Sequence, residues 1–150
     1  MRDRLVIQIL NEENEEKCKE LILLGLKERF GFIDHTLNPD LHKMFDYYSQ
    51  NNRLFLTGFI DDTLVCTGAL VEEKNTVGRI VRMSVKKEYR GRGIARRLLR
   101  ELEDAAKNKG YRVIVIETNN RWKSALSLYH SSGYIDYLND GDCTHMSKTI

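Results

Sequence analysis

The chain has 150 residues, a formal net charge of +2, 41% hydrophobic and 31% charged residues, and one proline. These values are typical of a soluble globular protein, and we predict a single domain over residues 1–150. No run of about 18 apolar residues is present, which argues against a membrane span. The N-terminal residues also lack the apolar core of a signal peptide, so we expect a cytoplasmic protein.

The first third of the chain predicts one strand and two helices. Residues 5–10 form the strand, and a helix follows Asn11 and closes at Phe30-Gly31. A second helix is predicted from Asn38-Pro39 onward, because a cap residue is followed there by proline at the first helical position. The predicted apolar faces carry Cys18, Leu21, Ile22, Gly25 and Leu26 in the first helix and Leu41, Met44, Phe45 and Tyr48 in the second. Residues 32–37 are too irregular for an element, and their apolar side chains fit either a substrate-pocket wall or core packing.

The rest of the chain alternates predicted strands and helices. Three antiparallel strands are expected at 54–60, 63–71 and 77–85, and a glycine-rich turn leads to a helix that ends at Lys109-Gly110. Residues 113–116 are a continuous β-branched run, typical of a strand buried on both faces. A short helix at 123–132 and strands at 134–138 and 144–149 follow. We therefore predict a mixed α/β fold with a largely antiparallel sheet and one parallel pair formed within residues 77–118.

The glycine-rich turn at residues 90–95 reads Arg90-Gly91-Arg92-Gly93-Ile94-Ala95. A helix start presents unpaired N–H groups and the positive end of the helix dipole, so it favours a phosphate. The glycines let the backbone approach a ligand closely. The turn fits neither the dinucleotide fingerprint nor the phosphate-loop pattern. It predicts a pyrophosphate cradle, with an ordinary strand-to-helix loop as the alternative.

Basic residues are concentrated around this turn. Nine of them lie within 22 positions: Arg79, Arg82, Lys86, Lys87, Arg90, Arg92, Arg96, Arg97 and Arg100. They form either a solvated basic face or a funnel for a polyanionic ligand, and their coincidence with the turn favours the funnel. A nucleic-acid-binding module is not favoured, because the aromatic residues are not interleaved with the cluster as a stacking platform would need.

The cysteines and histidines predict no metal site. Cys18, Cys66 and Cys143 are far apart and lack metal-ligand spacing, so they are expected to be small buried residues in a reducing compartment. His35, His42, His130 and His145 likewise form no ligand pair in the sequence.

Three stretches occur in order at a characteristic spacing. They are Arg82-Met83-Ser84-Val85 followed by Tyr89 and the turn at 90–95, then Ile116-Glu117-Thr118, and then residues 125–134, which read Ala-Leu-Ser-Leu-Tyr-His-Ser-Ser-Gly-Tyr. The turn resembles the acyl-CoA signature of the GNAT acetyltransferases, and the last stretch resembles their Ala-x-x-Leu-Tyr-x-x-x-Gly-Phe/Tyr segment. The element order matches the GNAT fold over nearly the whole chain. The resemblance implies a mostly antiparallel seven-stranded sheet with a splayed parallel pair and about four helices.

The resemblance also implies acetyl-CoA as co-substrate and a set of binding residues. The pantetheine arm would lie between the splayed strands and bond to the backbone of the segment Met83, Ser84 and Val85. Amides of the turn at 90–95, from Arg90 through Gly91, Arg92, Gly93 and Ile94 to Ala95, would hold the pyrophosphate. Tyr129 matches the family tyrosine that protonates or hydrogen-bonds the CoA sulfur. The alternative for Tyr129 is a helix tyrosine that packs on the sheet with its hydroxyl in water.

The general base and one cofactor contact depart from the family pattern. The closest subgroup has glutamate where this chain has Arg79, so Glu117 is the candidate base, with Glu72 behind it. Glu117 could equally be paired with a nearby arginine, and a water chain is a further route for the proton. Trp122 replaces the usual Asn or Gln that touches the cofactor arm; Asn119 or Asn120 could supply that contact, or Trp122 could pack on the pantetheine or on an adjacent subunit.

The acceptor is expected to be a primary amine of a small molecule, amino acid or peptide. Arg79 and Arg82 flank Ile80 and Val81, and we expect both arginines on one strand face, where they would bind an acceptor carboxylate or phosphate if that face lines the pocket. The stretch Asp46-Tyr47-Tyr48 would instead attract a cationic amine. The alternative to an N-acetyltransferase is a catalytically weak acyl-CoA-binding regulator. The family often forms dimers, which leaves a homodimer open.

Overall fold

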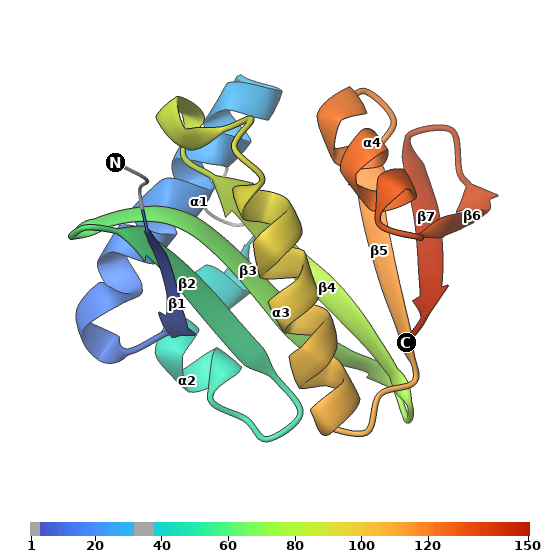
Figure 1. The fold of residues 1–150 in the computed structure, drawn as a ribbon, viewed down its shortest axis with the longest axis horizontal. Coiled ribbons are helices and arrows are strands. Elements are labelled where there is room, and N and C mark those ends of the chain that lie inside the picture. Colours follow the sequence, from blue (N-terminus) through green and yellow to red (C-terminus); the bar gives the residue numbers. More distant parts are fainter. Residues whose placement is uncertain (1–3, 32–37) are drawn as a thin grey trace.

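The computed structural model describes residues 4–31 and 38–150. Seven strands form one sheet in the order β1-β2-β3-β4-β5-β7-β6 (Figure 1). All neighbouring strands pair antiparallel except β4 and β5, which are parallel. The strands are β1 Leu5–Ile9, β2 Leu54–Ile60, β3 Thr63–Lys74, β4 Val77–Val85, β5 Val113–Asn119, β6 Ile135–Asn139 and β7 Cys143–Thr149. The predicted mixed sheet with one parallel pair is therefore confirmed.

In the part of the chain that the structure describes, four α-helices and three 3-10 turns connect these strands. The helices are α1 Glu15–Phe30, α2 Met44–Tyr48, α3 Ile94–Asn108 and α4 Lys123–Ser131, and the 3-10 turns are η1 Glu12–Asn14, η2 Pro39–Leu41 and η3 Lys87–Tyr89. None of the helices in the described part of the chain is long and apolar enough to cross a membrane.

Most element ends agree with the predictions, and the differences have local causes. The side chain of Asn11 caps η1, accepting from the amide of Asn14 at 2.9 Å, and α1 begins only after that turn. The predicted second helix is divided into η2 and the short α2, because Lys43 between them leaves the helical region with φ −140° and ψ 68°. β5 continues to Asn119 because it pairs with β7 along its whole length. The prediction that residues 32–37 form no element falls outside the described residues.

The sheet carries a separate hydrophobic cluster on each face. α3 and α4 cover one face, in front in Figure 1, and α1 and α2 cover the other. Leu98, Leu99 and Leu102 of α3 pack on Leu70 and Ile114 of the sheet. On the opposite face, Cys18, Leu21 and Ile22 of α1 and Met44 of α2 pack on Phe55. Burying these apolar stripes is what holds both helix layers against the sheet.

The parallel pair opens partway along its length. Only Val77–Arg79 of β4 and Val113–Val115 of β5 are in register. Beyond that point β4 continues beside β3 and β5 continues beside β7, and the two strands diverge toward the top of Figure 1. Within residues 4–31 and 38–150, no strand therefore pairs with the end of β4 on its β5 side. This opening sits between the two helix layers and contains two cavities.

A bulge in β4 shapes the mouth of this opening. The β3–β4 register shifts between Thr67 and Ala69, and Arg82 lies in the left-handed region with φ 57°. Strict alternation would put residues three apart on opposite faces of a strand. The extra residue that β4 carries at the bulge shifts the alternation by one position, so that two residues three apart can lie on the same face. Arg79 shares the α1/α2 face with Val81 by alternation, and Arg82 points to the same face, where it binds Asp40 of η2.

Candidate functional site

Two cavities meet where β4 and β5 diverge. The first, of about 200 Å³, lies on the α1 side; we call it the α1-side cavity, and its walls include Ile22, Leu26, Val81, Glu117 and Trp122. The second, of about 490 Å³, lies against the start of α3; we call it the α3-side cavity, and its walls include Tyr89, Gly91, Gly93, Ile94, Ala95 and Ser127. Seven residues line both cavities: Arg29, Met83, Ser84, Val85, Arg90, Ala125 and Tyr129. The two cavities are thus contiguous through the sheet, and a reaction between two bound molecules could occur at their junction.

The glycine-rich turn forms the α3 end of the larger cavity. Gly91 and Gly93 have φ of 78° and 80°, which residues other than glycine rarely adopt, and a β-carbon at either position would meet nothing within 4 Å. Gly93 is the N-cap of α3, and no side chain among the described residues caps this helix start. The first amides of α3 therefore lack intrahelical acceptors and face an open, positively polarised space. This arrangement fits a bound phosphate group.

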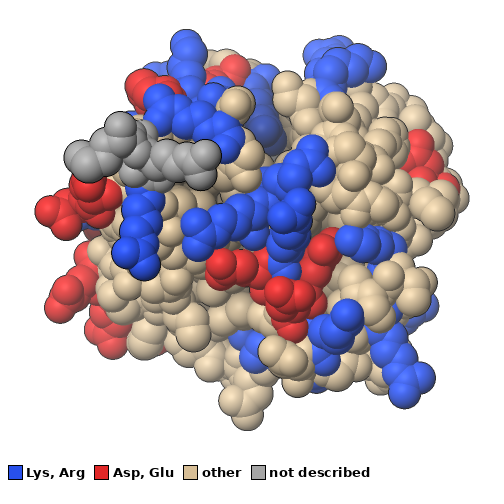
Figure 2. Space-filling view, in the orientation of Figure 1, with Lys and Arg blue, Asp and Glu red and all other residues tan. Residues whose placement is uncertain are grey.

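Arginines surround this turn, and each has a structural contact. Arg90 donates to the carbonyl of Val85 at 2.9 Å and lies 3.0 Å from Glu28 of α1. Arg96 donates to the hydroxyls of Ser131 (2.8 Å) and Ser132 (3.3 Å), which ties α3 to α4 across the cavity wall. Arg92 stacks on Tyr89 with its guanidinium carbon 5.0 Å from the ring centre. In Figure 2, Lys and Arg side chains gather over the start of α3, with acidic side chains beside them further along the helix.

Tyr129 lies at the junction of the two cavities. Its side chain is 6% exposed, and its ring packs edge-on against Tyr134 with 6.0 Å between ring centres. Burial raises the pKa of Tyr129 to about 12, against the opposing effect of the Arg29 charge. The Tyr129 hydroxyl forms no hydrogen bond within the described residues. Every fully buried side-chain oxygen in that part of the chain has a hydrogen-bond partner, so the Tyr129 hydroxyl is not fully buried. Because Tyr129 lines both cavities, we infer that its hydroxyl opens into them. Tyr129 can therefore hold a proton at the junction throughout the neutral pH range.

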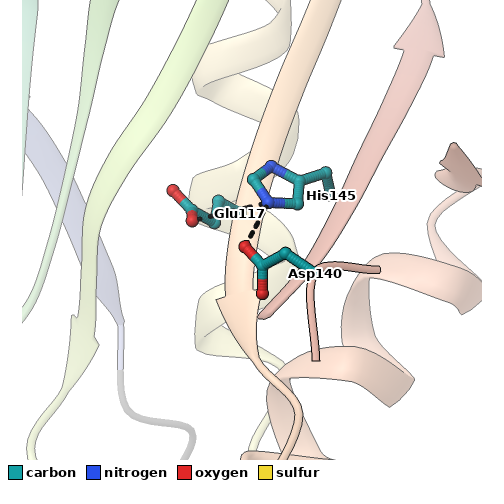
Figure 3. Close-up of side chains that lie close together, drawn as sticks. All are labelled: Glu117, Asp140 and His145. Carbon is teal, nitrogen blue, oxygen red and sulfur yellow. Dashed lines mark hydrogen bonds and ion pairs between the residues drawn. The ribbon is translucent and has the colours of Figure 1, made fainter. Parts of the chain in front are cut away.

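Glu117 enters the α1-side cavity from the diverging end of β5. Figure 3 shows its carboxylate beside His145 of β7 and Asp140 of the β6–β7 turn. His145 Nε2 lies 3.0 Å from Asp140 Oδ2 and 3.6 Å from Glu117 Oε1, and Arg79 Nη1 lies 3.8 Å from Glu117 Oε2. The His145 side chain and the amides of Cys143 and Asp142 lower the pKa of Asp140 to about 2. Glu117 thus faces both an arginine and a histidine while remaining 43% exposed.

Asp140 and His145 are close together in the sequence, but Glu117 lies on an earlier strand, well before both. Glu117, Asp140 and His145 each offer one atom that could bind a metal ion, and these three atoms lie within 4.8 Å of one another. This grouping could not be seen from the spacing of the histidines. The absence of a metal stays a prediction. Of the three cysteines, Cys18 and Cys66 are buried and Cys143 is partly exposed.

The predicted acceptor-binding arginines both have acidic partners. Arg82 donates to Asp40 through Nη2 (2.6 Å) and Nε (3.0 Å), and Nη2 also donates to Asn38 at 2.9 Å. Arg79 donates through Nε to Glu73 at 2.7 Å and is not among the residues lining either cavity. Arg82 does line the α1-side cavity. Their roles in acceptor binding stay predictions, and the charge of each is largely balanced inside the protein.

Asn120 and Trp122, the two residues considered in place of the family's usual Asn or Gln contact to the cofactor arm, have different surroundings. The Asn120 side chain accepts from the hydroxyl of Thr144 at 2.5 Å and donates to Asn139 at 3.0 Å, so it faces β6 and β7; its role at the cofactor stays a prediction. Trp122 lines the α1-side cavity and packs edge-on against Phe30, with 5.4 Å between ring centres. Arg29 lies over its indole, 4.2 Å from the ring centre.

Sequence reasoning missed the contribution of α1 to both cavities. Gly25, Leu26 and Arg29 line the α1-side cavity, and Arg29 reaches the α3-side cavity as well. In the sequence, Arg29 looks like a basic residue that complements the dipole at the end of a helix. Only the packing of α1 across β4 brings it near Tyr129, one hundred positions later.

Comparisons with known proteins agree with this geometry. The model of the acetyltransferase (GNAT) family matches residues 13–134. The probable N-acetyltransferase 14 of Xenopus tropicalis is 34% identical over 99 residues, which are 65% of this chain and 48% of that protein. The chain spans about half the length of several curated relatives that it matches.

Two solved structures resemble this one over their full lengths. A GNAT-family acetyltransferase from Staphylococcus aureus Mu50 superposes with a TM-score of 0.89 at 22% identity, covering 97% of this chain and 99% of the other. The PaiA N-acetyltransferase of Thermoplasma acidophilum in complex with coenzyme A superposes with a TM-score of 0.83 at 22% identity, covering 98% and 99%. At these identities the likeness concerns the fold.

Proposed function

Because the chain belongs to the GNAT acetyltransferase family, we propose that it is an N-acetyltransferase that transfers an acetyl group from acetyl-CoA to a primary amine. The observation that carries the proposal is the meeting of two cavities at Tyr129 and the segment Met83–Val85. Such a junction lets two substrates approach from opposite faces of the sheet and react directly.

The α3-side cavity is the proposed site for acetyl-CoA. Its uncapped α3 start, the open space above Gly91 and Gly93, and the arginines beside them fit a pyrophosphate. The unpaired edge of β4 at Met83, Ser84 and Val85 fits an extended arm that pairs like a strand. The solved relative with coenzyme A bound supports this choice of ligand. Acetyl-CoA would supply the thioester carbonyl at the junction.

The α1-side cavity is then the acceptor site. An ammonium group that becomes an amide must release two protons, of which one is taken by the departing sulfur and one leaves the site. Glu117 is the proposed acceptor of the amine proton, because it is the carboxylate that lines this cavity. Tyr129 is the proposed donor to the sulfur, because its hydroxyl is protonated, open to both cavities and without a competing hydrogen bond among the described residues. The balanced outcome is an N-acetyl amide, a free thiol and one proton.

A cytoplasmic location and a homodimer are further proposals for this protein. The absence of a membrane or nucleic-acid partner is likewise an expectation.

A calorimetric titration with acetyl-CoA, run beside ATP as a phosphate control, tests the proposal first. We expect saturable binding of acetyl-CoA with an affinity at least about tenfold above that of ATP. Thiol release with a panel of amines then tests transfer. Equal binding of ATP and acetyl-CoA, or no binding of either, would contradict the proposal. Binding without thiol release from any amine would instead favour the acyl-CoA-binding regulator.

A further inference from the structure

Arg29 differs from the two other arginines that line the α1-side cavity, Arg82 and Arg90. Arg82 is paired with Asp40 at 2.6 Å, and Arg90 with Glu28 at 3.0 Å. Arg29 has no carboxylate partner within the described residues; its guanidinium contacts the indole of Trp122, 4.2 Å from the ring centre. Partial burial lowers the pKa of Arg29, while the residue as a whole stays exposed to solvent. An arginine that lines a cavity and has no carboxylate partner in the described part of the chain can form charge-assisted hydrogen bonds with a bound anion.

The position of Arg29 places that anion beside the reaction centre. Arg29 lines both cavities and lies close enough to Tyr129 for each charge to affect the other's pKa. Its guanidinium carbon lies over the Trp122 ring, 4.2 Å from the ring centre, and the planar fork of an arginine suits a two-point contact with a carboxylate. The anion would therefore lie near the amine that reacts at Tyr129.

The α1-side cavity offers the complementary charge and an apolar wall. Glu117 lines it, and a carboxylate there favours an incoming ammonium group. Ile22, Leu26 and Val81 line the same cavity. A cavity with one carboxylate, one guanidinium that has no ion-pair partner among the residues described, and an apolar wall matches a zwitterion with an apolar side chain.

From this combination we propose that the acceptor is a free α-amino acid with an apolar side chain, whose carboxylate binds Arg29. The inference rests on the proposed N-acetyltransferase function. In an α-amino acid the carboxylate is two bonds from the amine, which suits a guanidinium next to the reaction centre. A peptide N-terminus has an amide at that position and leaves Arg29 without a counter-ion. The α1-side cavity, at about 200 Å³, is also small.

The test compares acceptors that differ only in the carboxylate. Leucine, leucinamide and a leucine-first tripeptide are assayed by thiol release with acetyl-CoA. We expect kcat/KM for leucine to exceed that for leucinamide by about 10- to 100-fold, the range for a hydrogen-bonded contact to a charged group. The amine of leucinamide is less basic, so more of it is in the reactive free-base form, and the comparison is biased against the proposal.

Variants of Arg29 test whether this residue is responsible for the preference for leucine over leucinamide. Arg29→Gln is expected to lower kcat/KM for leucine by about 10- to 100-fold, to leave leucinamide within about threefold and to leave the KM for acetyl-CoA unchanged. Arg29→Lys should restore part of the preference, because it keeps the charge without the planar fork. Arg53→Gln is the matched control: Arg53 stacks on Tyr47, with its guanidinium carbon 4.1 Å from the ring centre, and lines neither cavity, so its loss should change none of these values.

Several outcomes would overturn the inference and leave the proposed function standing. These are equal use of leucine and leucinamide, better use of the tripeptide, or an equal loss for all acceptors in Arg29→Gln. A rise in the KM for acetyl-CoA alone would assign Arg29 to the cofactor instead. Failure of the proposed function looks different: no acetyl-CoA binding and no acetylation of any amine.

Discussion

At the residue scale, the site depends on a few side chains whose surroundings set their chemistry. Tyr129 stays protonated because its ring is buried between the sheet and Tyr134, while its hydroxyl reaches the junction of the cavities. Glu117 is held at the mouth of the other cavity between Arg79 and His145. In the proposed reaction, the Tyr129 hydroxyl donates a proton and the Glu117 carboxylate accepts one, because amide formation requires both a donor and an acceptor.

Tyr129→Phe tests the proposed proton donor. Removing the hydroxyl leaves the packing of the ring on Tyr134 intact, so acetyl-CoA binding should be unchanged by calorimetry. The kcat for thiol release should fall by about 100- to 10,000-fold, the usual contribution of a general acid. Because the pKa of Tyr129 is raised to about 12, wild-type kcat should show no alkaline loss from this group up to about pH 10. A variant with wild-type kcat would remove Tyr129 from the mechanism.

Glu117→Gln tests the proposed base against the second candidate. The amide cannot accept a proton at neutral pH, and kcat/KM should fall on the order of 100-fold with the affinity for acetyl-CoA retained. Glu72→Gln is the matched control, since Glu72 accepts a hydrogen bond from Asn52 at 3.1 Å and lines neither cavity. Wild-type activity in both variants would point to water as the proton acceptor.

At the scale of elements, the strand–turn–helix from β4 to α3 builds the proposed cofactor site. β4 supplies an unpaired edge, the turn supplies positive φ at Gly91 and Gly93, and α3 supplies free amides at its start. α3 is fixed in place by Leu98 and Leu102, which are fully buried in the core. The rigid packing of the helix is what allows its exposed end to serve as a preformed anion site.

Gly93→Ala separates backbone strain from loss of binding. Alanine in the left-handed region costs about 1–2 kcal/mol, so the thermal midpoint should fall. Acetyl-CoA affinity should also fall, because the amides of the turn would shift. Gly141→Ala is a matched control at φ 98° in the β6–β7 turn, again with nothing near an added β-carbon. It should lower the midpoint by a similar amount and leave acetyl-CoA binding unchanged; equal binding losses in both variants would contradict a special role for the turn.

At the scale of the whole molecule, a few long-range contacts hold the helix layers against the diverging strands. The Arg82–Asp40 pair joins β4 to η2 across 42 positions, with side chains only 18% and 13% exposed. Tyr48 also donates to Asp40, at 2.6 Å. Burial alone would raise the pKa of Asp40, but the hydrogen bonds from Arg82 and Tyr48 outweigh burial and lower it below its usual value. This network fixes η2 and α2 beside the opening that contains the α1-side cavity.

Asp40→Asn tests this network through stability and its pH dependence. A depressed pKa in the folded state means that the stabilisation is present above the unfolded value, near pH 4, and is lost as the pH falls through the folded value. Wild-type stability to urea should therefore decrease below about pH 4, and part of this decrease should be absent in Asp40→Asn. At neutral pH the variant should lose about 3 kcal/mol, because Arg82 remains buried without its charge partner. Glu73→Gln, which breaks the more exposed pair with Arg79, should cost less than about 1 kcal/mol.

The sequence by itself determined the order of strands and helices along the chain, the glycine-rich turn and the short helix that carries Tyr129. Hydrophobic periodicity and turn residues act over a few positions, so they can be read locally. The tertiary structure decided the rest. Arg29 reaches Tyr129 only because α1 packs across β4, and His145 meets Glu117 only because β7 pairs with β5. The bulge at Arg82 changes which face that side chain points to, and its pairing with Asp40 changes what it can bind. These contacts join residues 28 to 100 positions apart, and no local pattern encodes which partners the folded chain will bring together.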